Sequence, residues 1–328
     1  MQLAASTSLT PTQKSNLVFL AKAALSMALV AVVARQLDFN ALAVQLRNVH
    51  LGWLALGAAL VVVQTASGAM RWQAIIIAQG GRVDLLTTFR IYYVSVFFAT
   101  FTPGGVFGDV VRVWHANRIG LSLASSISSV ILDRLFVVTF LVAIAILTVQ
   151  FLPPGAQSQF PFGVMSALLF AALLAGLVIP LVIRWLPAGL RSHALVAKIV
   201  SLADSMLSVT TRPRSLGWII FLTAVSQVVL CGVIAVLSLS VDIGVGMVEF
   251  MVLMPPVILA TVLPISIGGW GMRETAMVFM LSLVGVAPER AFLLSVLMGV
   301  VTVVMSLPGG VLWLLFPQAG PQRNAPSP

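Results

Sequence analysis

Two glycine-rich segments, 99–105 and 260–271, interrupt this apolar chain, and each combines a proline with paired glycines. Each leads into acidic and basic residues: Asp109 and Arg112 after the first, and Arg273 and Glu274 after the second. Backbone N–H groups at such turns and the guanidinium of arginine both bind phosphate oxygens. Apolar helices broken at matching places in two halves are typical of transport sites in lipid. The pattern therefore predicts a translocator with a site for an anionic group.

The composition indicates a membrane protein. Of the 328 residues, 60% are hydrophobic and only 8% are charged, and the mean hydropathy is +1.10. A soluble domain of this size would not tolerate such a surface. The net charge of +9 comes from basic residues scattered between apolar segments, where they set membrane topology rather than bind nucleic acid. We predict an all-α polytopic bundle, because a membrane barrel would show short alternating segments instead.

Several apolar segments exceed the ~20 residues that cross ~30 Å of hydrocarbon. The predicted spans are 16–34, 51–78, 85–101, 121–150, 163–186, 215–240, 248–263, 272–287 and 291–316. Two shorter amphipathic stretches, 38–50 and 190–210, fit helices that lie along the membrane surface. The predicted organisation is a cytoplasmic leader (1–15), one integral membrane domain (16–316, with halves about 16–150 and 163–316 and a cytoplasmic linker at 184–214) and a disordered tail (317–328).

The basic residues predict the orientation. The linker 184–214 is strongly basic and is expected in the cytoplasm, whereas 151–162 carries no charge and is expected outside. Segment 85–118 has basic residues on both flanks: Arg71, Arg82 and Arg90 before it, and Arg112 and Arg118 at its end. A single crossing cannot place both flanks in the cytoplasm. We therefore expect a re-entrant hairpin that turns at Pro103, Gly104 and Gly105.

The second interrupted segment, 248–287, begins and ends outside in this scheme and turns around Pro264, Gly268, Gly269 and Gly271. Its arms are long enough for a second re-entrant hairpin or for two full crossings, and the charges do not distinguish these. In either case the two halves are inverted relative to each other, and both termini are expected in the cytoplasm.

Asp133 and Arg134 lie near the middle of an apolar run, where an ionised side chain left alone would cost ~2.5–3.5 kcal/mol. Neighbours along a helix do not face one another, so each is expected to pair with a different element. We expect Asp133 to pair with Arg112 or Arg273, and Arg273 is the better phosphate ligand of the pair Arg273 and Glu274. A purely structural ion pair explains the same residues.

The sequence contains no nucleotide-binding loop, no metal-ligand spacing among its histidines and no supportable hydrolase triad, so we predict no metal and no cofactor. The single cysteine, Cys231, lies within an apolar span and excludes a disulfide framework.

The residues 102–112, the pair Asp133 and Arg134, and the residues 264–274 resemble the membrane region of lysylphosphatidylglycerol synthases, the multiple peptide resistance factors, and of their stand-alone relatives. The resemblance covers about 15–316. It implies a flippase-like module in which two re-entrant hairpins face a cavity for a phospholipid headgroup. The positions that match are Pro103, Gly104, Gly105, Gly108, Asp109, Arg112, Asp133, Arg134, Pro264, Gly268, Gly269, Gly271, Arg273 and Glu274.

The chain departs from the full synthases because no soluble aminoacyl-transferase domain follows its last span, so lysine transfer to lipid is not expected. Relatives without that domain are associated with varied lipids, including isoprenoid-linked glycans and hopanoids. The leading hypothesis is lipid translocation across a bacterial-type inner membrane, with Arg112, Arg134 and Arg273 neutralising an anionic phospholipid or isoprenoid phosphate.

Two alternatives stay open at this point. One is an intramembrane transferase that acts on a lipid phosphate, with Asp109, Asp133 or Glu274 as the base. The other is a non-catalytic subunit that positions a lipid- or glycan-modifying enzyme. A homo-oligomer is compatible with the sequence, and we expect no nucleic-acid partner.

Overall fold

The computed structural model describes residues 49–102, 105–185, 187, 194–262, 266 and 268–315. These residues fold into helices without any β-strand, which confirms the all-helical class. Five helical runs among them are long and apolar enough to cross a membrane: 51–78, 123–151, 162–183, 213–239 and 288–315. The chain is thus a multi-pass membrane protein.

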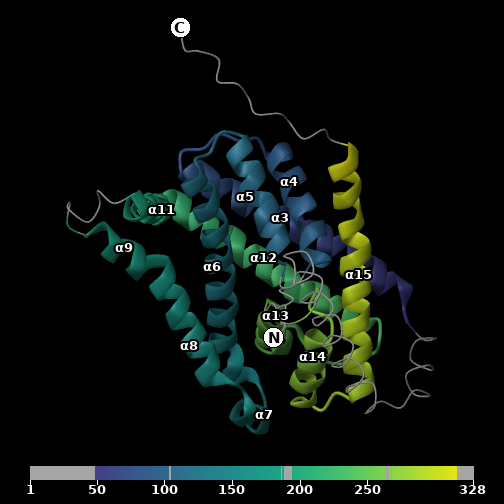
Figure 1. Ribbon diagram of the computed structural model, residues 1–328. Helices are drawn as coiled ribbons and strands as arrows, with labels where there is room; N and C mark the ends of the chain where they lie inside the picture. The colour runs from purple at the N-terminus through teal and green to yellow at the C-terminus, as the bar shows by residue number, and fades with distance from the viewer. Residues whose placement is uncertain are drawn as a thin grey trace, which may run out of the picture.

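The helices follow one another with short connections (Figure 1). The first half contains α3 (Leu51–Ala78), α4 (Leu85–Thr100), α5 (Val106–Arg118) and α6 (Leu123–Thr148). The 3-10 turn η1 (Val149–Phe151) and α7 (Pro154–Gln159) lead to α8 (Phe162–Leu173), the π-helical turn η2 (Leu174–Val178) and α9 (Ile179–Arg184). The remaining helices are α11 (Ala194–Thr210), α12 (Pro213–Leu239), α13 (Met247–Val262), α14 (Met272–Ser282) and α15 (Pro288–Leu315).

The predicted spans agree closely with these helices, with two qualifications. Segment 16–34, the leader 1–15, the tail 317–328 and nearly all of the surface stretch 38–50 lie outside the described residues. The predicted span 272–287 is shorter in the structure, because α14 ends at Ser282 and Gly285 adopts a left-handed φ of 78°. Stretch 190–210 contains α11, as expected for a helix.

Local sequence signals begin several of these helices. The Asp84 carboxylate accepts a hydrogen bond of 2.8 Å from the backbone N–H of Thr87 and so caps α4. This hydrogen bond holds the pKa of Asp84 below its usual value. Ser122 caps α6 in the same way, and Pro213 occupies the first position of α12, where its missing N–H is harmless.

The helices pack around two long central contacts. α3 packs along α12, and α15 packs against α4, while α5 returns beside α4. Figure 1 shows α8 and α9 leaning away from α6 toward α11. The largest cluster of buried apolar side chains lies between α12, α13, α14 and α15 and extends to α6, α7 and α8; it includes Phe250, Leu253, Met254 and Met277. The opposite half of the bundle encloses fewer apolar residues and contains most of the buried charges.

Candidate headgroup-binding cavity

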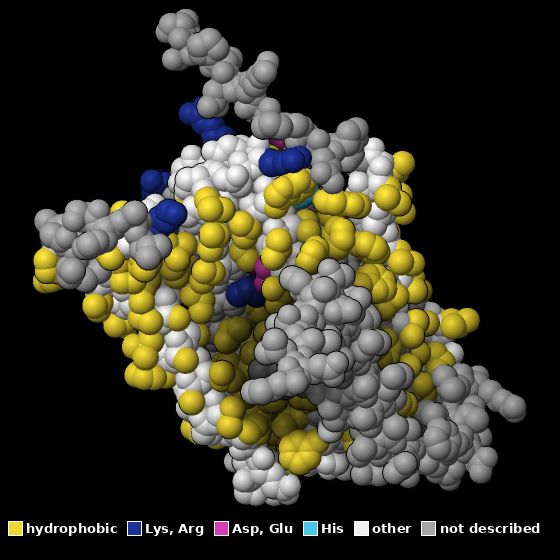
Figure 2. All heavy atoms as spheres, in the orientation of Figure 1, with side chains coloured by type: hydrophobic (Ala, Val, Ile, Leu, Met, Phe, Trp, Pro, Cys, Tyr) yellow, Lys and Arg dark blue, Asp and Glu magenta, His cyan; other side chains and the backbone are white. Residues whose placement is uncertain are grey.

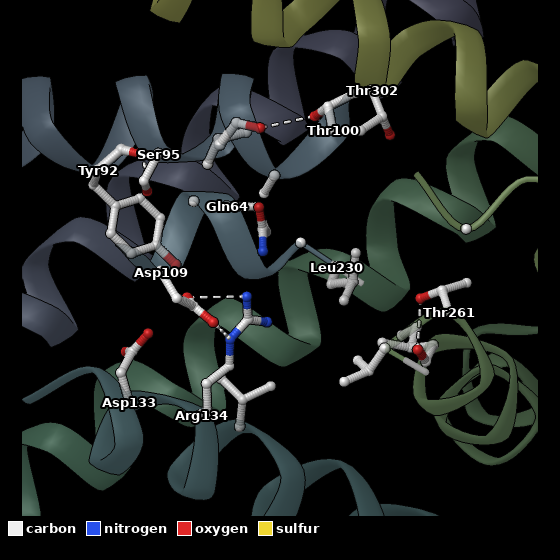
Figure 3. A pocket seen from close by; sticks show the side chains of 18 of the residues that line it. Gln64, Tyr92, Ser95, Thr100, Asp109, Asp133, Arg134, Leu230, Thr261 and Thr302 are labelled. Atoms are coloured by element: carbon white, nitrogen blue, oxygen red, sulfur yellow. Dashed lines mark hydrogen bonds and ion pairs between the residues drawn. The ribbon is translucent and has the colours of Figure 1, made fainter. Parts of the chain in front are cut away.

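A cavity of about 350 Å³ lies where α3, α4, α5, α6, α12, α13 and α15 meet. Figure 3 shows side chains from these helices pointing toward it. Its described lining residues are Gln64, Arg71, Tyr92, Ser95, Val96, Ala99, Thr100, Gly105, Gly108, Asp109, Arg112, Asp133, Arg134, Val137, Gln227, Leu230, Ile258, Thr261, Val262, Gly268, Gly269 and Thr302. One wall is therefore charged, and the rest is apolar or neutral.

Asp133 lies at the centre of the charged wall. Its Oδ1 accepts a 2.7 Å hydrogen bond from Nε of Arg71 on α3, and its Oδ2 accepts a 2.6 Å hydrogen bond from Nη1 of Arg112 on α5. All three side chains are at most 4% exposed. The predicted pair of Asp133 with Arg112 is therefore confirmed, whereas the alternative partner, Arg273, is wrong.

Asp109 extends the same network toward the open side of the cavity. It accepts a 2.6 Å hydrogen bond from Nη2 of Arg112, and its two oxygens accept 3.1 Å hydrogen bonds from Nε and Nη2 of Arg134. The charges thus alternate from Arg71 through Asp133, Arg112 and Asp109 to Arg134. Asp133 and Arg134 bind different residues, but the expectation that each pairs with a different element is wrong in part, because both bind α5: Asp133 through Arg112 and Arg134 through Asp109.

Arg134 is the last residue of this charge network, and its side chain is more exposed than those of Arg71 and Arg112. Its side chain is 41% exposed, and Nη1 takes no part in the bonds to Asp109. Figure 3 shows its guanidinium projecting into the cavity beside Asp109. Figure 2 shows basic and acidic side chains together in the middle of an otherwise apolar face, beside a hollow. Arg134 is therefore the cation of this network that a ligand can reach.

The charge balance of the described lining is uneven. It contains three arginines and two aspartates, so the cavity carries a formal excess of one positive charge. A buried charge is costly to leave without a partner, and the cost is reduced by an anion. The aromatic rings of Trp72 and Tyr92 lie 5.6 and 5.2 Å from the Arg112 guanidinium carbon and partly stabilise it.

The glycines bring the two interrupted segments close together. Gly105, the N-cap of α5, has a left-handed φ of 68°, and a Cβ placed there would lie 3.5 Å from Nη2 of Arg134. A Cβ at Gly268, whose φ is 58°, would lie 2.5 Å from the backbone oxygen of Thr100. At Gly108 the backbone of α5 lies directly against Ser95 and Ala99 of α4. Side chains at these positions would separate the turns from each other or from the network.

The structure thus divides the predicted site residues into three groups. Those that line the cavity are Gly105, Gly108, Asp109, Arg112, Asp133, Arg134, Gly268 and Gly269. Those outside its lining are Gly271, Arg273 and Glu274. Pro103, Gly104 and Pro264 lie outside the described residues.

Arg273 and Glu274 form a second buried group beside the cavity. Nη2 of Arg273 lies 2.7 Å from Oε1 of Glu274, and both side chains contact the hydroxyl of Ser295 on α15. Glu274 also accepts the N–H of Gly271, while the Trp270 ring lies 4.6 Å from the Arg273 guanidinium carbon. These two neighbours pair with each other because Glu274 turns back to cap the helix and Arg273 follows it. Arg273 is thus held beside the second glycine-rich segment, outside the cavity lining.

Eight polar residues that line this cavity were not among the predicted site residues, and Arg71, Gln64 and Gln227 are three of them. Arg71 was interpreted as a topology-setting charge, but it is 2% exposed and bound to Asp133 and Ser226. Gln64 lies seven residues earlier on α3, which places it on the same helix face. Gln227 lies next to Ser226 on α12 and is 2% exposed. A polar side chain at helical spacing within an apolar span was the available signal.

The fold and cavity define a helical membrane protein with an arginine-rich chamber between two glycine turns. The profile of the family "Lysylphosphatidylglycerol synthase TM region" matches residues 19–310. The chain belongs to this family, and the resemblance inferred from the glycine motifs is confirmed. A comparison with curated protein sequences gave no significant match. The family and the membrane helices together indicate a membrane role related to lipids.

Proposed function

We propose that this protein translocates a lipid with an anionic headgroup across the inner membrane, with the headgroup held in the cavity on Arg134. The observation that carries the proposal is the unmatched positive charge of the cavity lining. Each arginine has a carboxylate partner, but Arg112 and Arg134 share Asp109, so the lining lacks one full counter-charge. A charged side chain left without a partner at membrane depth costs about 2.5–3.5 kcal/mol on insertion scales. A phosphate that enters the cavity compensates this charge and forms charge-assisted hydrogen bonds with the guanidinium.

The lengths of the helices support two re-entrant segments, one in each half. α4 and α5 contain 16 and 13 residues, and α13 and α14 contain 16 and 11. At ~1.5 Å per residue each helix is about 17–24 Å long, which is less than the ~30 Å of the hydrocarbon. In each pair the two helices pack against each other. Among the two choices for 248–287, these lengths favour a re-entrant hairpin. The proposed orientation, with both termini in the cytoplasm, rests on the basic linker 184–214 and does not depend on this choice.

The geometry favours translocation over an intramembrane transferase. Asp133 uses one oxygen for Arg71 and the other for Arg112, so it is poorly placed to accept a proton from a substrate. Glu274 is fully buried and caps Gly271 outside the cavity lining. Asp109 is partly exposed but is bound by Arg112 and Arg134. These carboxylates hold arginines in place, which is the role a headgroup site requires.

The proposal is tested in proteoliposomes with an acyl-labelled phosphatidylglycerol, with and without a proton gradient. The label that reaches the outer leaflet is extracted by albumin over time. We expect the protein to accelerate this transfer, and Arg134→Gln to slow it by at least tenfold, the loss expected for a charge-assisted hydrogen bond. Arg134 is half-exposed, and Asp109 keeps Arg112 as a partner, so this variant should still fold.

Arg290→Gln is the matched control, because Arg290 is exposed and outside the cavity lining, with a hydrogen bond to the backbone oxygen of Asp242. It should transfer lipid at the parent rate. Transfer no faster than in protein-free vesicles, for anionic, lysyl and polyprenyl-phosphate lipids alike, would refute the proposal. Equal rates for Arg134→Gln and Arg290→Gln would also refute the role of Arg134.

A further inference from the structure

Gln227 is a buried amide whose oxygen has no partner. Its side chain is 2% exposed, and Oε1 makes no hydrogen bond. Nε2 makes only one, a long contact of 3.4 Å to the Ser226 hydroxyl. Nearly all buried polar atoms in proteins have a partner, so an unsatisfied one requires an explanation. Gln227 lines the cavity, so a ligand there can supply the missing hydrogen-bond donor.

Gln64 adds a second neutral amide to the same cavity. It is partly buried on α3, and Figure 3 shows its amide directed into the cavity between Thr100 and Arg134. Within the described part of the chain its side chain makes no hydrogen bond. Two neutral amides, Gln64 on α3 and Gln227 on α12, therefore line the same cavity as the charged wall.

The neutral and charged parts of the cavity are joined by hydrogen bonds. Ser226, next to Gln227, accepts a 2.7 Å hydrogen bond from Nη1 of Arg71, whose Nε binds Asp133. Because α3 and α12 pack along each other, this link fixes Gln227 relative to the arginines. Both parts line one cavity of about 350 Å³, so they are available to the same ligand.

We propose that Gln227 and Gln64 form a second, uncharged subsite that hydrogen-bonds a hydroxyl group on the alcohol part of a phosphodiester headgroup. This inference rests on the proposed function, in which Arg134 holds the phosphate. A phosphodiester carries one negative charge, which matches the single excess positive charge of the lining. A hydroxyl then supplies the donor without adding charge, whereas an ammonium group would restore the excess.

The consequence is selection by hydrogen bonding. A site built to pair with a polar group rejects an analogue that lacks it, because its own buried atom stays unsatisfied. We expect a headgroup with a hydroxyl to bind about tenfold more tightly than one of equal charge without a donor. Gln227 is the determinant of this preference, and Arg134 is not.

The test measures binding rather than transport, so that it is independent of translocation. The detergent-solubilised full chain is equilibrated with equimolar dihexanoyl phosphatidylglycerol and dihexanoyl phosphatidylethanol, and the bound ratio is measured by native mass spectrometry. Both lipids carry one negative charge, but only the first has hydroxyls. Dihexanoyl phosphatidylethanolamine, with an ammonium group and no net charge, is the third probe.

We expect a bound ratio of about ten in favour of phosphatidylglycerol, which Gln227→Met reduces to about one by weakening only the hydroxyl-bearing lipid. Methionine has a similar size but no hydrogen-bonding amide. The exposed Gln159→Met should keep the parent ratio. A parent ratio near one, no binding of either lipid, or an unchanged ratio in Gln227→Met would overturn the subsite. Binding of phosphatidylethanolamine equal to that of phosphatidylglycerol would overturn the preference of the subsite for an uncharged donor. Binding with the expected ratio but no transfer in vesicles would refute translocation alone.

Discussion

Asp133→Asn is the perturbation that most directly tests how the buried charges are held. The substitution keeps the size of the side chain but removes the negative charge that Arg71 and Arg112 share. The formal excess of the cavity lining then rises from one positive charge to two. Because these side chains are at most 4% exposed, water cannot replace the lost partner.

The magnitude follows from the cost of breaking a buried ion pair, about 3–5 kcal/mol. Each kcal/mol shifts the midpoint of thermal unfolding by about 2–4 °C in a domain of 150–250 residues, so we expect a decrease of roughly 6–20 °C. The assay is the thermal loss of the monodisperse peak of the solubilised protein at a fixed heating rate. Asp242→Asn is the matched control, since Asp242 is exposed and its left-handed φ of 53° suits asparagine.

A double-mutant cycle makes this test sharper. Arg71→Gln combined with Asp133→Asn restores the original charge balance, so the double variant should be less destabilised than the sum of the single variants. Additive losses would show that Arg71 and Asp133 are not coupled. An Asp133→Asn protein as stable as the Asp242→Asn control would refute the electrostatic reasoning.

The other predictions concern packing, the second charged group and topology. Gly108→Ala should destabilise the protein by about 1–3 kcal/mol through overpacking of α5 on α4, whereas Gly217→Ala, with open space around it, should be neutral or stabilising in the same thermal assay. Glu274→Gln should lower thermal stability but leave the ratio of bound lipids unchanged, because Glu274 is buried outside the cavity lining; a changed ratio would contradict this. A membrane-impermeant maleimide should not label the buried Cys231 in intact cells. It should label Ser158→Cys from outside and Arg214→Cys only after permeabilisation; the reverse pattern would contradict the predicted topology.

The long helices could be predicted from the sequence because the backbone N–H and C=O groups of each apolar run must form hydrogen bonds within the run when it lies in lipid. The predicted segments 51–78 and 215–240 differ from α3 and α12 by at most two residues at either end. The bond between Asp133 and Arg112 was also predictable, since a carboxylate in an apolar span needs a cation. In contrast, Arg71 resembled a flanking topology charge, and only the packing of α3 against α6 and α12 reveals its role.

The sequence by itself determined which segments are apolar helices, where glycine and proline interrupt them, and that isolated charges within them need partners. Only the tertiary structure decided how those charges are distributed. It placed Arg134 in the cavity but paired Arg273 with its own neighbour, Glu274. In the sequence both arginines look alike, because each is next to an acidic residue. The physical reason is that hydropathy acts on each segment separately, whereas an ion pair depends on the distance between side chains from helices far apart in the chain.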